Sequence, residues 1–309
     1  MKSFCSNRRA FLKGALGGVA GLSIASTSGG AESTSSGIHT TEVAENLYLL
    51  TGAGANVVAR TGSDGVLLVD GGSAEHAAAL AQAVAALPGG RPVRTLFNTH
   101  WHPEQTGSNL ALGRSGATII AHEATRLWLT TDVTRPGKDK TYRRLPQEAL
   151  PNKTFLEKDA LRVDDEIIEF GHLAGAHTAG DIYVFFPKTN VLAIGDVISG
   201  NGWPVVDWWT GGWIEGAAKA LEALLKVANW ETRVIAAQGP MMTRSDLESM
   251  QKMFATISQR LWTARIAGKN VDDALAMQPT REFNHRMGDP TQFLRSSFQS
   301  MWGHVTPHA

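Results

Sequence analysis

The sequence predicts a mixed α/β fold in which two similar halves pack sheet against sheet. Short β-branched runs separated by Gly, Asn and Asp turns are followed by helical segments, and this order occurs twice. The 309 residues include 32 Gly, 12 Pro and 3 Tyr, which favours a loop-rich α/β protein over a helical bundle. Apolar residues make up 43% and charged residues 19%, as in a globular protein with a substantial core.

Charge balance and cysteine content exclude several classes of protein. The chain has 29 Lys and Arg against 29 Asp and Glu, so it lacks the basic footprint of a nucleic-acid binder. Cys5 is the one cysteine, which excludes a disulfide framework, a cysteine-based zinc finger and an iron–sulfur cluster.

The N-terminus has the pattern of an export signal. Arg8 and Arg9 precede a short apolar stretch, and residues 1–31 resemble a twin-arginine signal peptide. We therefore expect the twin-arginine translocase to export the protein to the periplasm or beyond, with no membrane contact after processing. An uncleaved amphipathic helix is the alternative. Residues 32–40 are expected to form a linker and residues 41–309 the folded domain.

The first half of that domain alternates between short strands and helices. Apolar runs bounded by Gly, Asn or Asp predict strands at 47–51, 56–60, 65–70, 93–98 and 117–121. Ser73 is expected to cap an Ala-rich helix that ends near Leu87. Further helices are expected at 106–113 and 122–129.

The second half repeats the order of strands and then helices. Residues 131–153 are polar and are expected to form a surface loop. Apolar and alternating runs predict strands at 166–170, 182–186, 191–196 and 233–237. An amphipathic helix is expected at 214–227, and the chain after the last strand is expected to be mainly helical.

The strongest chemical signal lies directly after the strand 93–98. His100 and His102 are spaced so that a loop can turn both imidazoles into one pocket, and neutral histidine is the commonest metal ligand. His177 lies in a Gly-rich loop, and Asp70 and Asp196 each end an apolar strand. A buried carboxylate needs a partner or a metal, so these strand ends indicate a site at one edge of the sheets.

These motifs resemble those of the metallo-β-lactamase superfamily from about Glu42 to Met242. The resemblance implies a four-layer αββα sandwich. The family's first motif matches at Asp70, its His-x-His pair at His100 and His102, its Gly-His-Thr-x-Gly motif at His177 and its bridging Asp at Asp196. The resemblance further implies that the three histidines hold one metal ion.

The chain departs from the family at the second metal site. Where the family has Asp, His and a late His, this sequence has Glu104, Gln105 and Gln238. A neutral amide oxygen is a much weaker zinc ligand than an imidazole nitrogen. We therefore expect one Zn²⁺ per chain, held by His100, His102 and His177, with an open position at which the pKa of a bound water falls to about 7.

Roles for the other residues follow from this arrangement. Asp196 is expected to be a distant metal ligand or an acceptor that orients the attacking water, and Glu104 a general base or proton shuttle. Both could instead have purely structural roles. Gln105 and Gln238 are expected to hold substrate oxygens or to fill the vacated metal position. Asp70 is expected to accept a hydrogen bond from the ring N–H of a ligand.

The sequence thus predicts an exported metallo-hydrolase that cleaves an ester, lactone, thioester or amide bond of a small molecule. Two alternatives remain open. One is an iron-dependent oxygenase that uses His100, His177 and Asp196 as a two-histidine, one-carboxylate site. The other is a non-catalytic member of the fold that binds a metal or ligand.

Overall fold

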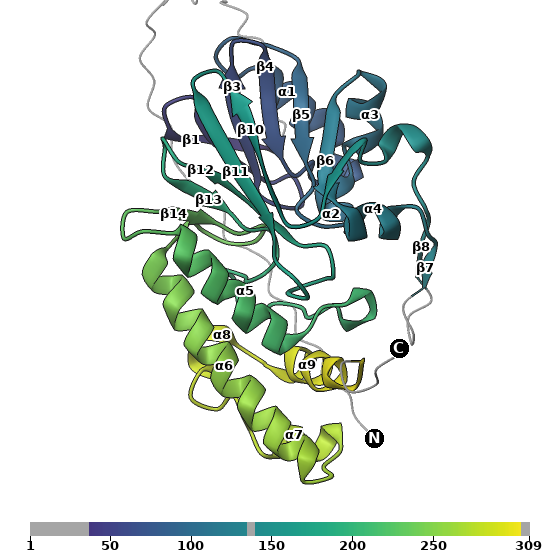
Figure 1. Ribbon diagram of the computed structural model, residues 1–309, viewed down its shortest axis with the longest axis vertical. Coiled ribbons are helices and arrows are strands. Elements are labelled where there is room, and N and C mark those ends of the chain that lie inside the picture. The colour runs from purple at the N-terminus through teal and green to yellow at the C-terminus, as the bar shows by residue number, and fades with distance from the viewer. Residues whose placement is uncertain (1–36, 135–139, 304–309) are drawn as a thin grey trace, which may run out of the picture. The chain divides into compact units, whose positions relative to one another are not determined.

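A computed structural model describes residues 37–134 and 140–303, which belong to one compact unit, Ser35–Ala309. Two β-sheets lie between layers of helices (Figure 1). The export signal, and residues 32–36 of the expected linker, lie outside the described residues. None of the described helices is long and apolar enough to cross a membrane.

The first sheet has seven strands. Their order is β1 (His39–Ala44), β2 (Leu47–Thr51), β3 (Val57–Gly62), β4 (Gly65–Val69), β5 (Val93–Phe97), β6 (Thr118–His122) and β9 (Lys153–Phe155). The strands β1 to β4 are antiparallel, and β4, β5, β6 and β9 are parallel. The strand β1 begins two residues before the domain boundary expected at residue 41.

The second sheet has six strands and a similar plan. Their order is β10 (Lys158–Val163), β11 (Glu166–His172), β12 (Ile182–Phe186), β13 (Val191–Ala193), β14 (Arg233–Ile235) and β15 (Met242–Thr243). An antiparallel run from β10 to β13 is again followed by a parallel pair, β13 and β14. In the first sheet, the connection from β6 to β9 contains the hairpin β7 (Val133–Thr134) and β8 (Thr141–Tyr142) and the short 3₁₀ helix η2 (Gln147–Ala149), so part of the segment expected to be a loop is regular.

The two sheets bury one apolar layer between them. Ile182, Val184 and Phe186 of β12 point into this layer, where Phe97 of the first sheet also lies. Tyr183, between them in sequence, packs on the helical side of the second sheet instead. Successive side chains of a strand point to opposite faces, so an apolar strand with a sheet on one side and helices on the other can bury both sets of side chains.

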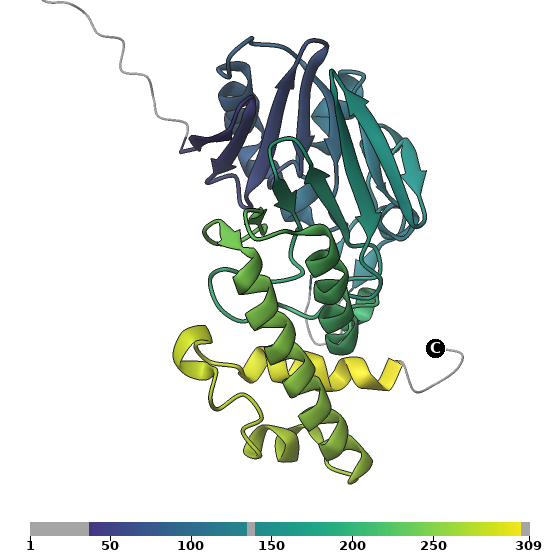
Figure 2. The same cartoon turned by 60° about the vertical axis from the view of Figure 1, so that its left-hand side comes forward.

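Helices cover both outer faces. The outer face of the first sheet packs against α1 (Ala77–Ala85) and α3 (Asn109–Arg114). On the second sheet's side, α5 (Ile214–Val227), α6 (Arg244–Ile266) and α9 (Thr291–Gly303) form one apolar cluster with the sheet, in which α9 packs on the two other helices. The helix α5 lies along α6 in both views (Figures 1 and 2). The short helices α7 (Val271–Ala276) and α8 (Asn284–Met287) connect α6 to α9. The four-layer α/β sandwich expected from the sequence is therefore confirmed.

Two local expectations were confirmed only in part. The helix expected at 106–113 is divided into α2 (Pro103–Thr106) and α3, because Gly107 donates its backbone N–H to the Gly72 carbonyl. A Cβ on Gly107 would lie 2.2 Å from the Ala74 nitrogen, so the chain can approach this closely only at glycine. Ser73 occupies the N-cap position of a short 3₁₀ helix, η1 (Ala74–His76), but its side chain caps no backbone N–H.

Candidate metal centre

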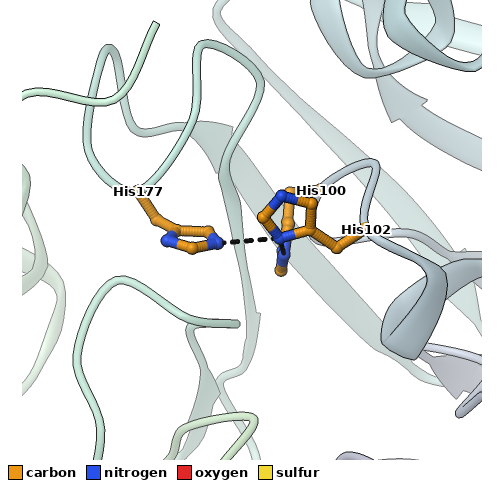
Figure 3. A group of neighbouring side chains, drawn as sticks. All are labelled: His100, His102 and His177. Carbon is orange, nitrogen blue, oxygen red and sulfur yellow. Dashed lines mark hydrogen bonds between the residues drawn. The ribbon is translucent and has the colours of Figure 1, made fainter. Parts of the chain in front are cut away.

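Three imidazole rings converge where strand ends of both sheets meet. His100 and His102 follow β5, and His177 lies in the loop between β11 and β12. Their ligand atoms all lie within 4.8 Å of one another, and Figure 3 shows the rings turned toward one point. His102 Nδ1 lies 3.0 Å from His100 Nε2 and 3.0 Å from His177 Nε2. The structure therefore brings together the three histidines that the sequence analysis singled out.

The outward nitrogen of each ring has a protein partner. His177 Nδ1 lies 2.7 Å from the Val205 carbonyl oxygen, which can only accept a hydrogen bond. His102 Nε2 lies 2.9 Å from the Asp207 carboxylate. Both rings therefore carry their proton on the outward nitrogen and turn an unprotonated nitrogen toward the other ligands.

The third ring is held through a hydroxyl group. His100 Nδ1 lies 3.2 Å from Thr99 Oγ1, and that hydroxyl donates to Asp70 Oδ2 at 2.8 Å. With its proton directed to Asp70, the Thr99 oxygen accepts from His100 Nδ1 and leaves Nε2 unprotonated. Three nitrogen lone pairs then face one another with no hydrogen to share, which is the donor set that a cation such as zinc requires.

Burial favours the neutral form of His100 and His102. It lowers the pKa of His100 well below the ordinary value, and the neighbouring His177 and His102 lower it further. Burial also lowers the pKa of His102, although its hydrogen bond to Asp207 opposes the change. Since metal ligation needs unprotonated imidazole, both pKa shifts favour metal binding at neutral pH.

Asp207 is a functional residue that the sequence analysis missed. Its buried carboxylate accepts from His102 and from Thr210 Oγ1, which lies 2.8 Å away. Thr210 in turn accepts from the Trp101 indole at 3.0 Å. A lone carboxylate in the apolar, Trp-rich segment 203–213 was the available signal, because such a group needs a buried partner.

Asp70 supports the site less directly than expected. It accepts from both the backbone N–H and the hydroxyl of Thr99, each at 2.8 Å, and no bond to an imidazole is seen among the described residues. Burial raises the pKa of Asp70, and the two bonds from Thr99 oppose the rise. Asp70 therefore orients His100 through Thr99.

Asp196 lies beside the histidine group but outside it. Its Oδ2 is 3.5 Å from His100 Nε2 and accepts a hydrogen bond from Gln105 Nε2 at 3.1 Å. Burial raises the pKa of Asp196, while the charges of His177 and His102 oppose the rise. Its side chain is partly exposed, so it can contact both the ligand group and a bound molecule.

The two amides expected at the altered second site both make protein contacts. Gln105 is buried, and its Oε1 has no hydrogen-bond partner within the described chain. Gln238 donates from Nε2 to the Gly54 carbonyl at 2.9 Å. Each amide nitrogen thus donates one N–H within the protein, which leaves its second N–H and the amide oxygen for other groups.

A cavity of about 330 Å³ opens at this point, within the usual range of small-molecule sites. Glu104 is exposed at the cavity, and Asp196 and Gln238 line it, whereas Asp70 and Gln105 are buried behind it. The complete lining is His102, Glu104, Tyr142, His177, Asp196, Ser199, Trp203, Pro204, Val205 and Gln238. The arrangement can hold a metal ion, move a proton through a carboxylate and bind a small molecule.

Comparisons with known proteins agree with this geometry. A family model described as "Metallo-beta-lactamase superfamily" matches residues 50–239, more than half of the chain. A metallo-beta-lactamase from Pontibacter korlensis superposes with a TM-score of 0.56 at 18% identity, over 71% of this chain and 99% of that one. The DIM-1 metallo-beta-lactamase also gives 0.56, at 19% identity, over 71% and 97% of the two chains.

A longer protein superposes over a larger share of this chain. The stereoselective inverting sec-alkylsulfatase Pisa1 from Pseudomonas sp. superposes with a TM-score of 0.62 at 16% identity, over 88% of this chain but 51% of its own. No curated protein matches the sequence. At these identities the solved structures show the fold alone.

Proposed function

Because the chain belongs to the metallo-β-lactamase superfamily, we propose that it is a hydrolase that depends on a single zinc ion. The observation that carries this proposal is the set of three imidazoles whose inward nitrogens are unprotonated because their outward nitrogens are anchored. Neutral imidazole suits zinc, and a three-histidine set leaves a position open for a reactant.

The bond to be cleaved would be an ester, lactone, thioester or amide bond. When bound, zinc would polarise the carbonyl group and lower the pKa of an attacking water to about 7. Asp196 would hold and orient that water, because its carboxylate lies beside His100 and lines the cavity. Glu104, exposed at the same cavity, would carry a proton to the leaving group. The Gln238 amide would position substrate oxygens.

The proposal of one ion per chain rests on the two amides. Gln105 and Gln238 occupy positions where the family resemblance places imidazole ligands, and their nitrogens bond Asp196 and Gly54. A second cation would have amide oxygens in place of two imidazoles, and these are weak ligands for zinc. An iron oxygenase with a two-histidine, one-carboxylate site is less well supported, because His102 joins the histidine group and Asp196 lies outside it.

Metal analysis combined with a substrate panel tests the proposal. We expect the purified protein to carry about one zinc per chain and to cleave at least one of a set of esters, lactones, thioesters and β-lactams. His102→Ala should lose both properties, whereas His285→Ala, which changes an exposed histidine of α8, should keep them. Two zinc ions per chain would contradict the single-ion assignment.

Two other results would point to the alternative functions. Bound iron together with oxygen consumption would indicate an oxygenase. Metal binding without turnover of any compound above the His102→Ala background would indicate a non-catalytic binding protein.

Export by the twin-arginine route is also proposed, on the pattern of residues 1–31. Replacing both arginines, Arg8→Lys with Arg9→Lys, should retain the protein in the cytoplasm. Fractionation of cells that express either form measures this, and unchanged export would contradict the proposal.

A further inference from the structure

A second cavity lies next to the metal cavity. Its volume is about 290 Å³, and Tyr142 lines both cavities. The helix α2 separates them, since Glu104 faces the metal cavity while Pro103 and Thr106 line the second one. Because α2 starts directly after His102, the second cavity begins one residue from a metal ligand.

Aromatic rings connect the two cavities. The Trp101 ring lies 4.5 Å from the His102 ring, 5.4 Å from the Tyr142 ring and 6.4 Å from the Trp128 ring, measured between centroids. Trp101, Trp128 and Tyr142 all line the second cavity. They belong to a hydrophobic cluster that is separate from the main core, together with Leu129, Val133, Leu145 and Leu150.

Four of the six polar side chains of this lining have partners inside the protein, whereas the Trp128 indole N–H and the Tyr142 hydroxyl bond no other described residue. The Trp101 indole donates to Thr210, and the Thr106 hydroxyl donates to the His102 carbonyl. The Thr131 hydroxyl donates to the Leu127 carbonyl. Arg143, the one charged side chain of the lining, pairs with Asp132 at 2.7 Å. A molecule in this cavity is therefore offered mainly apolar surface, with two neutral polar groups at Trp128 and Tyr142, and a charged group would lose most of its hydration without an opposite charge to replace it.

We propose that this apolar cavity is the part of the substrate site that takes an uncharged hydrocarbon group, an alkyl chain or an aromatic ring. The inference rests on the proposed hydrolase function, because it places the bond to be cleaved at the histidine group. The hydrocarbon group would pass Tyr142 and lie against Trp101 and Trp128. Preferred substrates would then be esters or related compounds with an extended apolar substituent.

Filling the cavity tests this assignment. Leu110 is half-buried and lines the cavity from α3, so Leu110→Trp should fill it from one side. Leu145→Trp fills it from a different segment and serves if the first variant does not fold. Leu127→Trp is the matched control, because Leu127 lies 63% exposed on α4 (Glu123–Leu129) and does not line the cavity.

The first measurement is kcat/KM for para-nitrophenyl acetate, butanoate and hexanoate. For the wild type and Leu127→Trp, we expect kcat/KM to rise about fourfold with each added methylene group, the effect of burying it. In Leu110→Trp the rise should fall below about twofold for each methylene. An equally steep rise in Leu110→Trp and Leu145→Trp would overturn the assignment.

The second measurement is binding of hexanol by isothermal titration calorimetry, which needs no turnover. Hexanol should bind the wild type and Leu127→Trp, and at least about tenfold more weakly to the filled variants, which lose several buried methylene contacts. If no ester is cleaved but hexanol binding shows this pattern, the hydrolase proposal fails while the cavity assignment stands. Equal binding to all four proteins would overturn the assignment.

Discussion

Asp207 supports one ring of the histidine group without belonging to that group. Its carboxylate accepts from His102 Nε2 at 2.9 Å and so directs the His102 Nδ1 lone pair toward the other two ligands. Thr210 and Trp101 hold the carboxylate from behind. An outward partner of this kind fixes the tautomer and raises the basicity of the ligand.

Asp207→Asn should therefore weaken zinc binding by roughly 10- to 100-fold while the protein stays folded. The amide keeps the size of the side chain but removes the charge that holds the His102 proton outward. Competition with a chromophoric chelator measures the affinity. The control is Asp159→Asn, which alters an exposed ion pair with Lys153. The role assigned to Asp207 is wrong if both variants bind zinc equally well.

The sequence could predict the three candidate ligand histidines but not the residues that hydrogen-bond their outward nitrogens. His100 and Asp196 follow local apolar strand patterns and His177 lies in a Gly-rich loop, which makes them visible in sequence. Asp207 meets His102 across 105 residues, so its partner depends on the complete fold. Asp70 was visible as a strand end, but its action through Thr99 depends on the side-chain geometry at that end.

At the scale of elements, local periodicity predicted the regular segments well. The helix expected at 214–227 and the strand expected at 182–186 have those bounds in the structure. The helix repeats its apolar residues at the helical period, and the strand is a short, nearly all-apolar run, so both are visible in the sequence. The division between α2 and α3 could not be predicted, because it comes from a contact of Gly107 with Gly72, a distant segment.

Gly195, two residues after β13, lies against Thr99, two residues after β5, and this close approach requires glycine. Gly195 has a φ of +57°, and a Cβ there would lie 2.6 Å from Thr99 Oγ1, the hydroxyl that contacts His100. Gly195→Ala should therefore lower the free energy of unfolding by about 2 kcal/mol or more, from backbone strain and from this clash. Urea unfolding measures the change.

A second glycine separates these two causes. Gly116 has a φ of +86° but no atom within 4 Å of the added Cβ. Gly116→Ala should thus lower the unfolding free energy by only about 1 kcal/mol. Equal losses in the two variants would mean that the close approach to Thr99 is unimportant.

A stacked histidine pair links β6 and β11. The rings of His122 and His172 lie 3.6 Å apart at an angle of 10°. His122 accepts from the Ala124 N–H and thereby caps α4, while its other nitrogen lies 2.9 Å from the Leu156 carbonyl. Burial, followed by the charge of His172, lowers the pKa of His122 from 6.5 to about 4.

This pair should make stability depend on pH. Between pH 6.5 and about 4 the unfolded chain binds a proton at His122 that the folded protein does not. The contribution of neutral His122 to the free energy of unfolding is therefore complete above pH 6.5 and is lost as the pH falls toward 4. Over this pH range we expect the free energy of unfolding to fall by an amount on the order of 2 kcal/mol, and we expect this fall to be absent in His122→Gln. Urea unfolding of chelator-treated protein measures it, with His76→Gln, an exposed histidine, as control. An identical pH profile for His122→Gln would contradict this account.

At the scale of the whole molecule, the histidine group joins the two sheets. His100 and His102 follow a strand of the first sheet, and His177 precedes a strand of the second. Hydrogen bonds also span this edge, such as the one from the Ile182 N–H to the Thr99 carbonyl at 2.9 Å. A bound cation would therefore connect elements that are more than 70 residues apart in sequence, as the separation of 75 between His102 and His177 shows.

Zinc should consequently stabilise the complete fold and not merely the loops around it. A ligand at about 100 times its dissociation constant raises the free energy of unfolding by about 2.7 kcal/mol if the unfolded chain does not bind it. We expect a chelator to lower the urea midpoint of the wild type accordingly, in one cooperative transition seen by both far-ultraviolet circular dichroism and tryptophan fluorescence. His100→Ala should unfold at the lower midpoint and should not respond to the chelator, since the two remaining imidazoles bind zinc far more weakly than three. A chelator effect of equal size in His100→Ala, or one confined to fluorescence, would show that the ion does not connect the two sheets.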